Sequence, residues 1–309
     1  MAVLSELRYP TSLLIKILTR AFSLVLLFVL LAVSIAAYLV YQVVDPLRTP
    51  SKVDFSVLLG HPEDVAFALP DGSRRHGWFF PGLRGAPTIL VCHGYESQST
   101  EALPIVTALQ ESHYNVFLFD FSGHGSSSGI TTLGYRESGD VRAAIRALAA
   151  RDDVDHERFG AWGADMGAYS ILSIAETDSR IAAIALDSVY DSPPEFFHEQ
   201  VRRSGLSVFP LVTRIADFGF WLMNYKDRGV RPLSTNLVRL AGVPKLFIFT
   251  HSVPELADST DRIYQVAPLP RQAISERAPY SEMTDEERQE YENVLVNFFV
   301  QNLSPAPRH

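Results

Sequence analysis

The chain lacks the features that would assign it to several common classes of protein. Cys92 is its single cysteine, which excludes an intramolecular disulfide and a metal site built from several cysteines. No block of lysine and arginine, low-complexity tract or internal repeat is present, and the formal net charge is -8. A nucleic acid held through its phosphates is therefore not expected as a partner. The 309 residues, 47% hydrophobic and 20% charged, suffice for one large domain and an appendage.

Charge is also absent from one long stretch near the N-terminus. Residues 21–44 carry no charged side chain and consist mainly of Leu, Val, Ile, Phe and Ala. Such a stretch can cross a hydrocarbon core of about 30 Å. Arg8, Lys16 and Arg20 precede it, whereas the basic residues that follow are mixed with acidic ones. The positive-inside rule then predicts a cytoplasmic N-terminus (residues 1–20), a single-pass transmembrane helix and an extracytoplasmic domain.

A cleaved signal peptide is the alternative interpretation of this stretch. Ser34 and Ala36 have the small-x-small spacing of a cleavage site. The apolar run continues past Ala36, however, and the apolar core of a signal peptide spans only about 7–15 residues. We therefore expect an uncleaved membrane anchor.

The remainder alternates between strand-like and helix-like segments. A proline-rich linker is expected at 45–62, followed by one domain at 63–303 that begins with a hairpin. Predicted strands follow at 88–92, 115–119, 159–162, 181–186, 245–250 and 272–275. Predicted helices lie near 103–112, 134–150, 166–175, 258–266 and 284–303. This alternation predicts an α/β fold with a mostly parallel sheet flanked by helices.

A long insertion, at about 188–243, separates two of the predicted strands. It is rich in aromatic residues, including Phe196, Phe197 and Trp221. Because it follows the C-terminal end of a strand, it is placed like a lid over a site at the sheet edge. Simple helical packing is the alternative role for these aromatic residues. An apolar or acyl ligand could bind beneath the insertion.

The sequence Gly163-Ala164-Asp165-Met166-Gly167 lies between a predicted strand and a predicted helix. Strand, tight glycine turn and helix form the setting of the nucleophile elbow, Gly-x-Ser-x-Gly, in which the turn exposes a reactive hydroxyl. Here the central position holds Asp165 in place of serine.

Several motifs in order resemble those of the α/β-hydrolase superfamily. His93-Gly94-Tyr95-Glu96 resembles its oxyanion loop, and residues 120–129 match its Asp-x-x-Gly-x-Gly-x-Ser-x-Gly turn. Gly134-Tyr135-Arg136-Glu137 and the turn at Asp165 complete the order. The resemblance covers residues 60–303. Within the superfamily, the chain most resembles the membrane-anchored branch that includes bud-emergence-like proteins and serine-aminopeptidase-like domains. It implies an α/β-hydrolase fold that uses neither metal nor cofactor.

The resemblance also implies a Ser–His–acid triad, and all three positions differ here. Asp165 takes the place of the serine, Val253 that of the acid and Tyr280 that of the histidine. No histidine lies between His251 and His309. Substitutes for the missing acid could come from Glu255 or Asp258. His251 could be a relocated base, although a surface position after the strand is the better expectation.

Two roles are open for Asp165. In haloalkane dehalogenases and epoxide hydrolases, which share the fold that this chain resembles, an aspartate attacks carbon, and a histidine then activates water. Otherwise Asp165 is a helix N-cap. The resemblance places His93 in the oxyanion loop, with the N–H groups of Tyr95 and Met166 as donors. We expect a pseudoenzyme; the alternative is a hydrolase using Asp165 on an epoxide, haloalkane or ester. No protein partner can be assigned.

Overall fold

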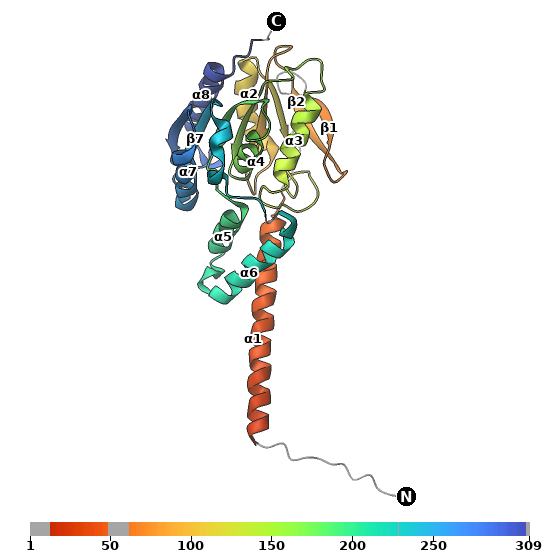
Figure 1. The fold of residues 1–309 in the computed structure, drawn as a ribbon, viewed down its shortest axis with the longest axis vertical. Coiled ribbons are helices and arrows are strands. Elements are labelled where there is room, and N and C mark those ends of the chain that lie inside the picture. Colours follow the sequence, from red (N-terminus) through yellow and green to blue (C-terminus); the bar gives the residue numbers. More distant parts are fainter. Residues whose placement is uncertain (1–12, 49–61, 228, 307–309) are drawn as a thin grey trace, which may run out of the picture.

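A central sheet organises the domain in the computed structural model, which describes residues 13–48, 62–227 and 229–306 (Figure 1). Its strands are β1 (Glu63–Ala68), β2 (Arg74–Phe80), β3 (Thr88–Cys92), β4 (Asn115–Phe119), β5 (Phe159–Ala164), β6 (Ile181–Asp187), β7 (Lys245–Thr250) and β8 (Arg271–Glu276). Their spatial order is β1-β2-β4-β3-β5-β6-β7-β8. β2 runs antiparallel to β1 and β4, and the other neighbouring pairs are parallel. The predicted mostly parallel sheet is confirmed.

Helices cover both faces of the sheet, which is why its central strands are apolar throughout. Every residue of β3 and β4 is buried. One face packs against α2 (Leu103–Glu111) and α8 (Asp285–Asn302). The other packs against α3 (Glu137–Leu148), α4 (Met166–Ala175) and α7 (Pro254–Val266).

The predicted helices agree with the observed ones to within their ends. α4 has the expected bounds, and α8 begins with a capping box, in which the Thr284 hydroxyl and the Glu287 carboxylate cap each other's backbone N–H groups. α7 starts at Pro254, before the predicted start at 258, because proline favours the first turn of a helix.

The N-terminal helix α1 (Leu13–Val44) begins earlier than the expected membrane span and includes Lys16 and Arg20. It is long and apolar enough to cross a membrane. Its side chains are exposed as far as residue 31, whereas Ala36, Leu39 and Val43 are buried against the domain. Residues 1–12 of the expected cytoplasmic segment and 49–61 of the expected linker lie outside the described residues.

The insertion forms α5 (Pro193–Arg203) and α6 (Pro210–Met223), joined and followed by short 3-10 turns. Figure 1 shows both helices outside the sheet layers, with α6 crossing α1. The insertion thus lies between the domain and the exposed part of α1.

Candidate functional site

Asp165 occupies a sharp turn between β5 and α4. Its backbone angles, φ 35° and ψ -99°, are rarely adopted by a residue with a side chain. Its N–H donates to the Asp187 carbonyl oxygen, 2.8 Å away, which ties the turn to the neighbouring strand β6. A Cβ on Gly167 would lie 2.2 Å from the Cys92 carbonyl oxygen, so only glycine allows α4 to approach β3 this closely. The turn therefore presents Asp165 at the C-terminal edge of the sheet.

The Asp165 carboxylate is held by two backbone N–H groups from different segments. Oδ1 accepts a hydrogen bond from Tyr95 N–H at 2.6 Å and a second, short one from Met166 N–H. Tyr95 follows β3, and Met166 begins α4. A Cβ on Gly94 would lie 2.4 Å from Oδ2, so the loop after β3 closes over the carboxylate only because residue 94 is glycine. These are the two donors that the sequence assigned to an oxyanion hole, and here they bind the protein's own carboxylate.

This arrangement differs from a simple N-cap. A cap binds N–H groups of its own helix, whereas one of the two donors here belongs to the loop after β3. Among the described residues, no histidine nitrogen is hydrogen-bonded to the Asp165 carboxylate.

Burial governs the electrostatics of Asp165. It raises the pKa of Asp165 to about 6, although the N–H groups of Met166 and Tyr95 oppose this shift. The nearby Asp187 charge raises the pKa further, and Arg203 lowers it. The carboxyl group therefore titrates near neutrality, well above an ordinary aspartate.

Asp187, at the end of β6, is a second buried carboxylate that the sequence analysis did not single out. It accepts hydrogen bonds from the hydroxyls of Ser188, Thr250 and Tyr291, all at 2.8–2.9 Å. Burial raises its pKa. The sequence could have indicated Asp187 as a candidate site residue. It directly follows the predicted strand at 181–186, and ligands bind at the edge where parallel strands end.

His93 does not act as a base in this geometry. Its Nδ1–H donates to the Gly94 carbonyl oxygen at 2.7 Å, and its Nε2 accepts from Phe121 N–H at 3.0 Å. Burial lowers the pKa of His93 to about 4, so the ring is neutral near pH 7. Both nitrogens brace the loop that carries Tyr95.

Neither Val253, at the position expected for the acid, nor Tyr280, at the position expected for the base, can take the catalytic role of that position. Val253 precedes α7 and lines the cavity as an apolar wall. The Tyr280 hydroxyl donates to a Glu292 carboxylate oxygen at 2.5 Å, and burial together with this carboxylate raises the pKa of Tyr280.

The residues considered as a substitute acid or base also lie outside the cavity over Asp165. His251 is exposed after β7 and does not line the cavity. Glu255 forms an ion pair with Arg202 on the surface, and Asp258 is exposed. The described residues include no group of three or more His, Cys, Asp or Glu placed to hold a metal ion.

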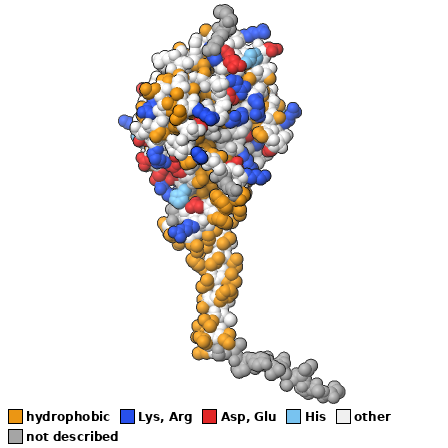
Figure 2. All heavy atoms as spheres, viewed as in Figure 1, with side chains coloured by type: hydrophobic (Ala, Val, Ile, Leu, Met, Phe, Trp, Pro, Cys, Tyr) orange, Lys and Arg blue, Asp and Glu red, His pale blue; other side chains and the backbone are white. Residues whose placement is uncertain are grey.

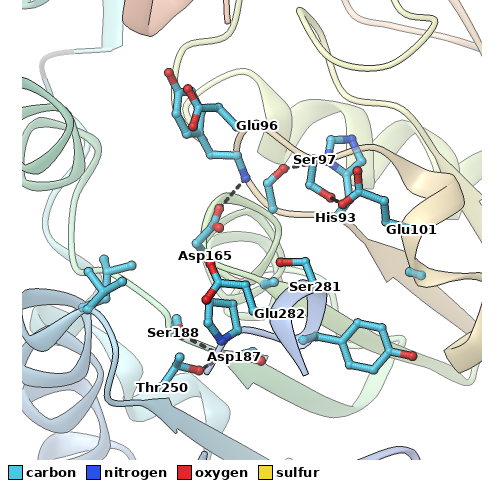
Figure 3. Close-up of a pocket in the computed structure, with 18 of the residues that line it drawn as sticks. His93, Glu96, Ser97, Glu101, Asp165, Asp187, Ser188, Thr250, Ser281 and Glu282 are labelled. Atoms are coloured by element: carbon cyan, nitrogen blue, oxygen red, sulfur yellow. Dashed lines mark hydrogen bonds between the residues drawn. The ribbon is translucent and has the colours of Figure 1, made fainter. Parts of the chain in front are cut away.

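A cavity of about 290 Å³ lies over the Asp165 turn. Its walls come from the loop after β3, the ends of β5, β6 and β7, helix α5, and the turn after β8 that carries Ser281 and Glu282 (Figure 3). Carboxyl groups line it at five positions: Glu96, Glu101, Asp165, Asp187 and Glu282. Among the described lining residues, Arg203 is the one with a permanent positive charge. The cavity is therefore unfavourable for an anionic ligand.

The loop after β3 also contacts the N-terminal helix and the insertion, and the loop after β4 binds the end of the same helix. The Tyr95 hydroxyl donates to the Val43 carbonyl oxygen at 3.0 Å, and the N–H of Thr131 donates to the Val44 carbonyl oxygen at 2.8 Å. The Tyr95 ring meets that of Phe196 in α5 edge to face, with centroids 5.5 Å apart. One tyrosine thus touches Asp165, α1 and α5.

Comparison with known proteins agrees with this architecture. Residues 87–220 match the family model described as alpha/beta hydrolase fold. The uncharacterized protein YfhR of Escherichia coli O157:H7 is 26% identical over 294 residues, which cover 91% of this chain and 95% of that protein. The uncharacterized protein MT2364 of Mycobacterium tuberculosis is 30% identical over 221 residues, or 66% of this chain and 77% of that protein.

Among solved structures, the esterase Pf2001 of Pyrococcus furiosus superposes with a TM-score of 0.66 at 20% identity, covering 84% of this chain and all of that one. An enol-lactonase from Burkholderia xenovorans LB400 superposes with a TM-score of 0.54 at 18% identity, covering 76% of this chain and all of that one. At such identities these likenesses describe the fold.

Proposed function

Because this chain belongs to the α/β-hydrolase superfamily, we propose that it is a membrane-anchored member that has lost ester turnover and keeps the cavity over Asp165 as a ligand-binding site. One observation carries the proposal: the Asp165 carboxylate already uses the N–H groups of Tyr95 and Met166. Those donors would have to bind the negative oxygen that forms during ester hydrolysis. A carboxylate in that place leaves the substrate oxygen without donors and repels its charge.

The surrounding groups support the same conclusion. Ester hydrolysis needs a base that takes a proton from the nucleophile or from water. His93 is bonded at both ring nitrogens, and the Tyr280 hydroxyl is bonded to Glu292. Neither is free to accept a proton near neutral pH.

The charge and shape of the cavity restrict the ligand. Its carboxyl groups disfavour fatty acids and other anions, and Phe196, Val253 and Leu256 supply apolar walls. A neutral molecule with an acyl or alkyl chain fits this lining best.

The anchoring proposal rests on α1 and its contacts. α1 can span a bilayer, and Ala36, Leu39 and Val43 are buried where it meets the domain. Cleavage after Ala36, as a signal peptide would require, would remove part of this packing. Lys16 and Arg20 on its N-terminal side favour a cytoplasmic N-terminus and a domain on the other side of the membrane.

An ester assay tests the loss of turnover. Full-length protein in detergent should hydrolyse p-nitrophenyl butyrate no faster than its Asp165→Ala variant. Asp165→Ser alone should not restore activity, because it supplies a nucleophile without a base. Hydrolysis by the wild-type chain well above that of Asp165→Ala would refute the proposal.

A second candidate is favoured by the free Oδ2 of Asp165. With Oδ1 fixed by two N–H groups, Oδ2 can attack an alkyl halide: a carbon–oxygen bond forms, the carbon–halogen bond breaks, and the halide leaves with its electron pair. The same N–H groups would then hold the carbonyl oxygen of the new ester. Without a base to activate water, this ester would persist.

Mass spectrometry separates the two candidates. Incubation with 1-bromohexane should leave one hexyl group on Asp165 if this candidate is correct, and none on an Asp165→Asn control. Labelling should accelerate as pH rises through about 6, because only the ionised carboxylate attacks and its pKa is raised to about 6. Absence of label at pH 8 would exclude Asp165 as a nucleophile toward this alkyl halide and leave the binding proposal.

A further inference from the structure

Helix α6 is apolar on both its sides. Val212, Ala216 and Phe220 are buried against the rest of the protein. The opposite, exposed stripe is Leu211, Phe218, Trp221 and Leu222, each 44–59% exposed, with Arg214 among them. A surface helix of a water-soluble domain normally presents polar residues on that side.

The exposed apolar surface extends beyond the helix at both ends. Val208 and Phe209 precede α6 and are 72% and 56% exposed, and Tyr225 follows it and is 45% exposed. Together with the stripe they form one patch, called here the α6 patch (Val208, Phe209, Leu211, Phe218, Trp221, Leu222 and Tyr225). A continuous apolar patch of this kind marks a binding surface.

The α6 patch lies beside the membrane-spanning candidate. α6 packs on α1 closely enough that a Cβ on Gly219 would lie 3.3 Å from a Val40 methyl group. Figure 2 shows hydrophobic side chains running without a break from α1 onto the insertion.

The length of α1 sets the level of the patch relative to a bilayer. Its 32 residues extend about 48 Å, whereas about 20 residues cross the hydrocarbon core. A span of that length that begins after Lys16 and Arg20 would end near residue 40, where Val40 meets Gly219 of α6. α6 therefore lies at the level of the lipid headgroups and the adjoining acyl chains.

We propose that the α6 patch inserts into the interfacial layer of the same bilayer that α1 crosses. The inference rests on the proposed anchoring by α1. Trp221 and Tyr225 are residue types enriched at this depth, and the long side chain of Arg214 can extend to the headgroups. A second copy of the chain is the other candidate for covering the α6 patch. Lipid is favoured because the patch is continuous with α1.

This placement would bring the cavity next to the lipid surface. α5, which leads into α6, contributes Phe196, Gln200 and Arg203 to the cavity wall. A neutral ligand dissolved in the bilayer could enter without crossing bulk water.

Nitroxide labels on the full-length chain test the inference in phosphatidylcholine nanodiscs. Cys92 is fully buried, so single added cysteines can be labelled selectively. The positions are Val208→Cys and Leu222→Cys in the α6 patch, with Leu27→Cys on α1 as a reference for lipid. Val238→Cys is the matched control, since Val238 is 79% exposed on another 3-10 turn away from α1. Oxygen, which concentrates in lipid, and a water-soluble nickel chelate then report the depth of each label.

The expected result is an oxygen-to-nickel accessibility ratio at positions 208 and 222 that is several-fold above that at 238 and close to that at 27. If 27 reports lipid while 208 and 222 match 238, the inference is overturned and the anchoring stands. If 27 itself reports water, the anchoring proposal fails, and the inference falls with it. Protection of 208 and 222 from both reagents, with dipolar broadening between labels, would assign the patch to a second copy and also overturn the inference.

Discussion

At the scale of the residue, the position of Asp165 decides what the site can do. A serine in this turn would place one oxygen in the cavity and leave the N–H groups of Tyr95 and Met166 for the substrate. The carboxylate instead binds both donors with Oδ1, and its Oδ2 lies beside Gly94, which leaves room for it because it has no side chain. The donors are used equally before and after any substrate arrives, so they cannot lower the barrier of an ester reaction.

The raised pKa of Asp165 predicts a pH-dependent effect of Asp165→Asn. The folded carboxyl group keeps its proton up to about pH 6, whereas in the unfolded chain it loses the proton near the ordinary aspartate pKa of 3.8. Wild-type stability should therefore decline as pH rises through this window, while the amide, which still accepts both N–H bonds, has no charge to bury. We expect Asp165→Asn to be more stable than wild type by about 1–2 kcal/mol at pH 7.5, less than the full shift implies because the carboxylate lines an open cavity.

Chemical denaturation of the full-length protein in detergent at pH 4 and pH 7.5 measures this difference. The gain should nearly vanish at pH 4. Asp258→Asn, at an exposed aspartate outside the cavity, should show no such change between the two pH values. An equal gain for Asp165→Asn at both pH values would mean that buried charge is not its cause.

Sequence reasoning could find both donors of this site but not what they bind. The motifs located Tyr95, Met166 and Asp165 and predicted them to meet at one strand edge. The sequence left two roles open for Asp165: a cap of its own helix, or a free nucleophile. Whether its Oδ1 reaches the Tyr95 N–H depends on the strained backbone at 165 and on the approach of the loop at Gly94, which residue types alone do not specify.

At the scale of the element, the C-terminal end of α1 is capped by the domain. The last carbonyls of a helix lack partners within it, and here those of Val43 and Val44 accept from Tyr95 and Thr131. Arg48, in the described start of the expected linker, donates to the carbonyl oxygens of Ser127 and Gly129. The end of α1 is thus fixed to the loop that carries Tyr95 and to the loop after β4. Pattern analysis could predict α1 as an apolar helix, but not which side of it the domain covers, because its residues are apolar all round.

Tyr95→Phe tests this connection. It removes the hydroxyl that binds Val43 and keeps the ring and the N–H that binds Asp165, so the loss of stability should be about 1 kcal/mol. Trypsin should then cleave after Arg48 several-fold faster, because the end of α1 is held less firmly. Tyr114→Phe is the control: it removes another tyrosine–backbone bond, to Leu303, and should lower stability without exposing Arg48. Equal cleavage rates in the two variants would argue against a specific connection through Tyr95.

At the scale of the whole molecule, the order of strands and helices was predictable because continuous apolar runs alternate with segments of helical apolar spacing, with turn residues between them. The relation of α1, α6 and the domain was not, since it depends on contacts between segments far apart in sequence. The buried alanines and carbonyl caps of α1 argue that it remains part of the mature protein.

Membrane extraction tests that conclusion. If α1 spans the bilayer as proposed and packs on the domain, the intact chain should stay in the membrane fraction after a carbonate wash and retain its N-terminal residues by mass spectrometry. A water-soluble mature form that begins near Ala37 would show instead that the segment is a signal peptide.

The docking of α1 on the loop that carries Tyr95, together with the proposed membrane anchoring, has a consequence for how the domain encounters ligands. A domain on a flexible tether samples a volume of solution, and its occupancy depends on molar concentration. A domain fixed at one height above a bilayer samples a plane, and its occupancy depends on the mole fraction of ligand among the lipids. Two ligands of equal intrinsic affinity would then be distinguished by how strongly each partitions out of water, so that selectivity would reside partly in the membrane itself.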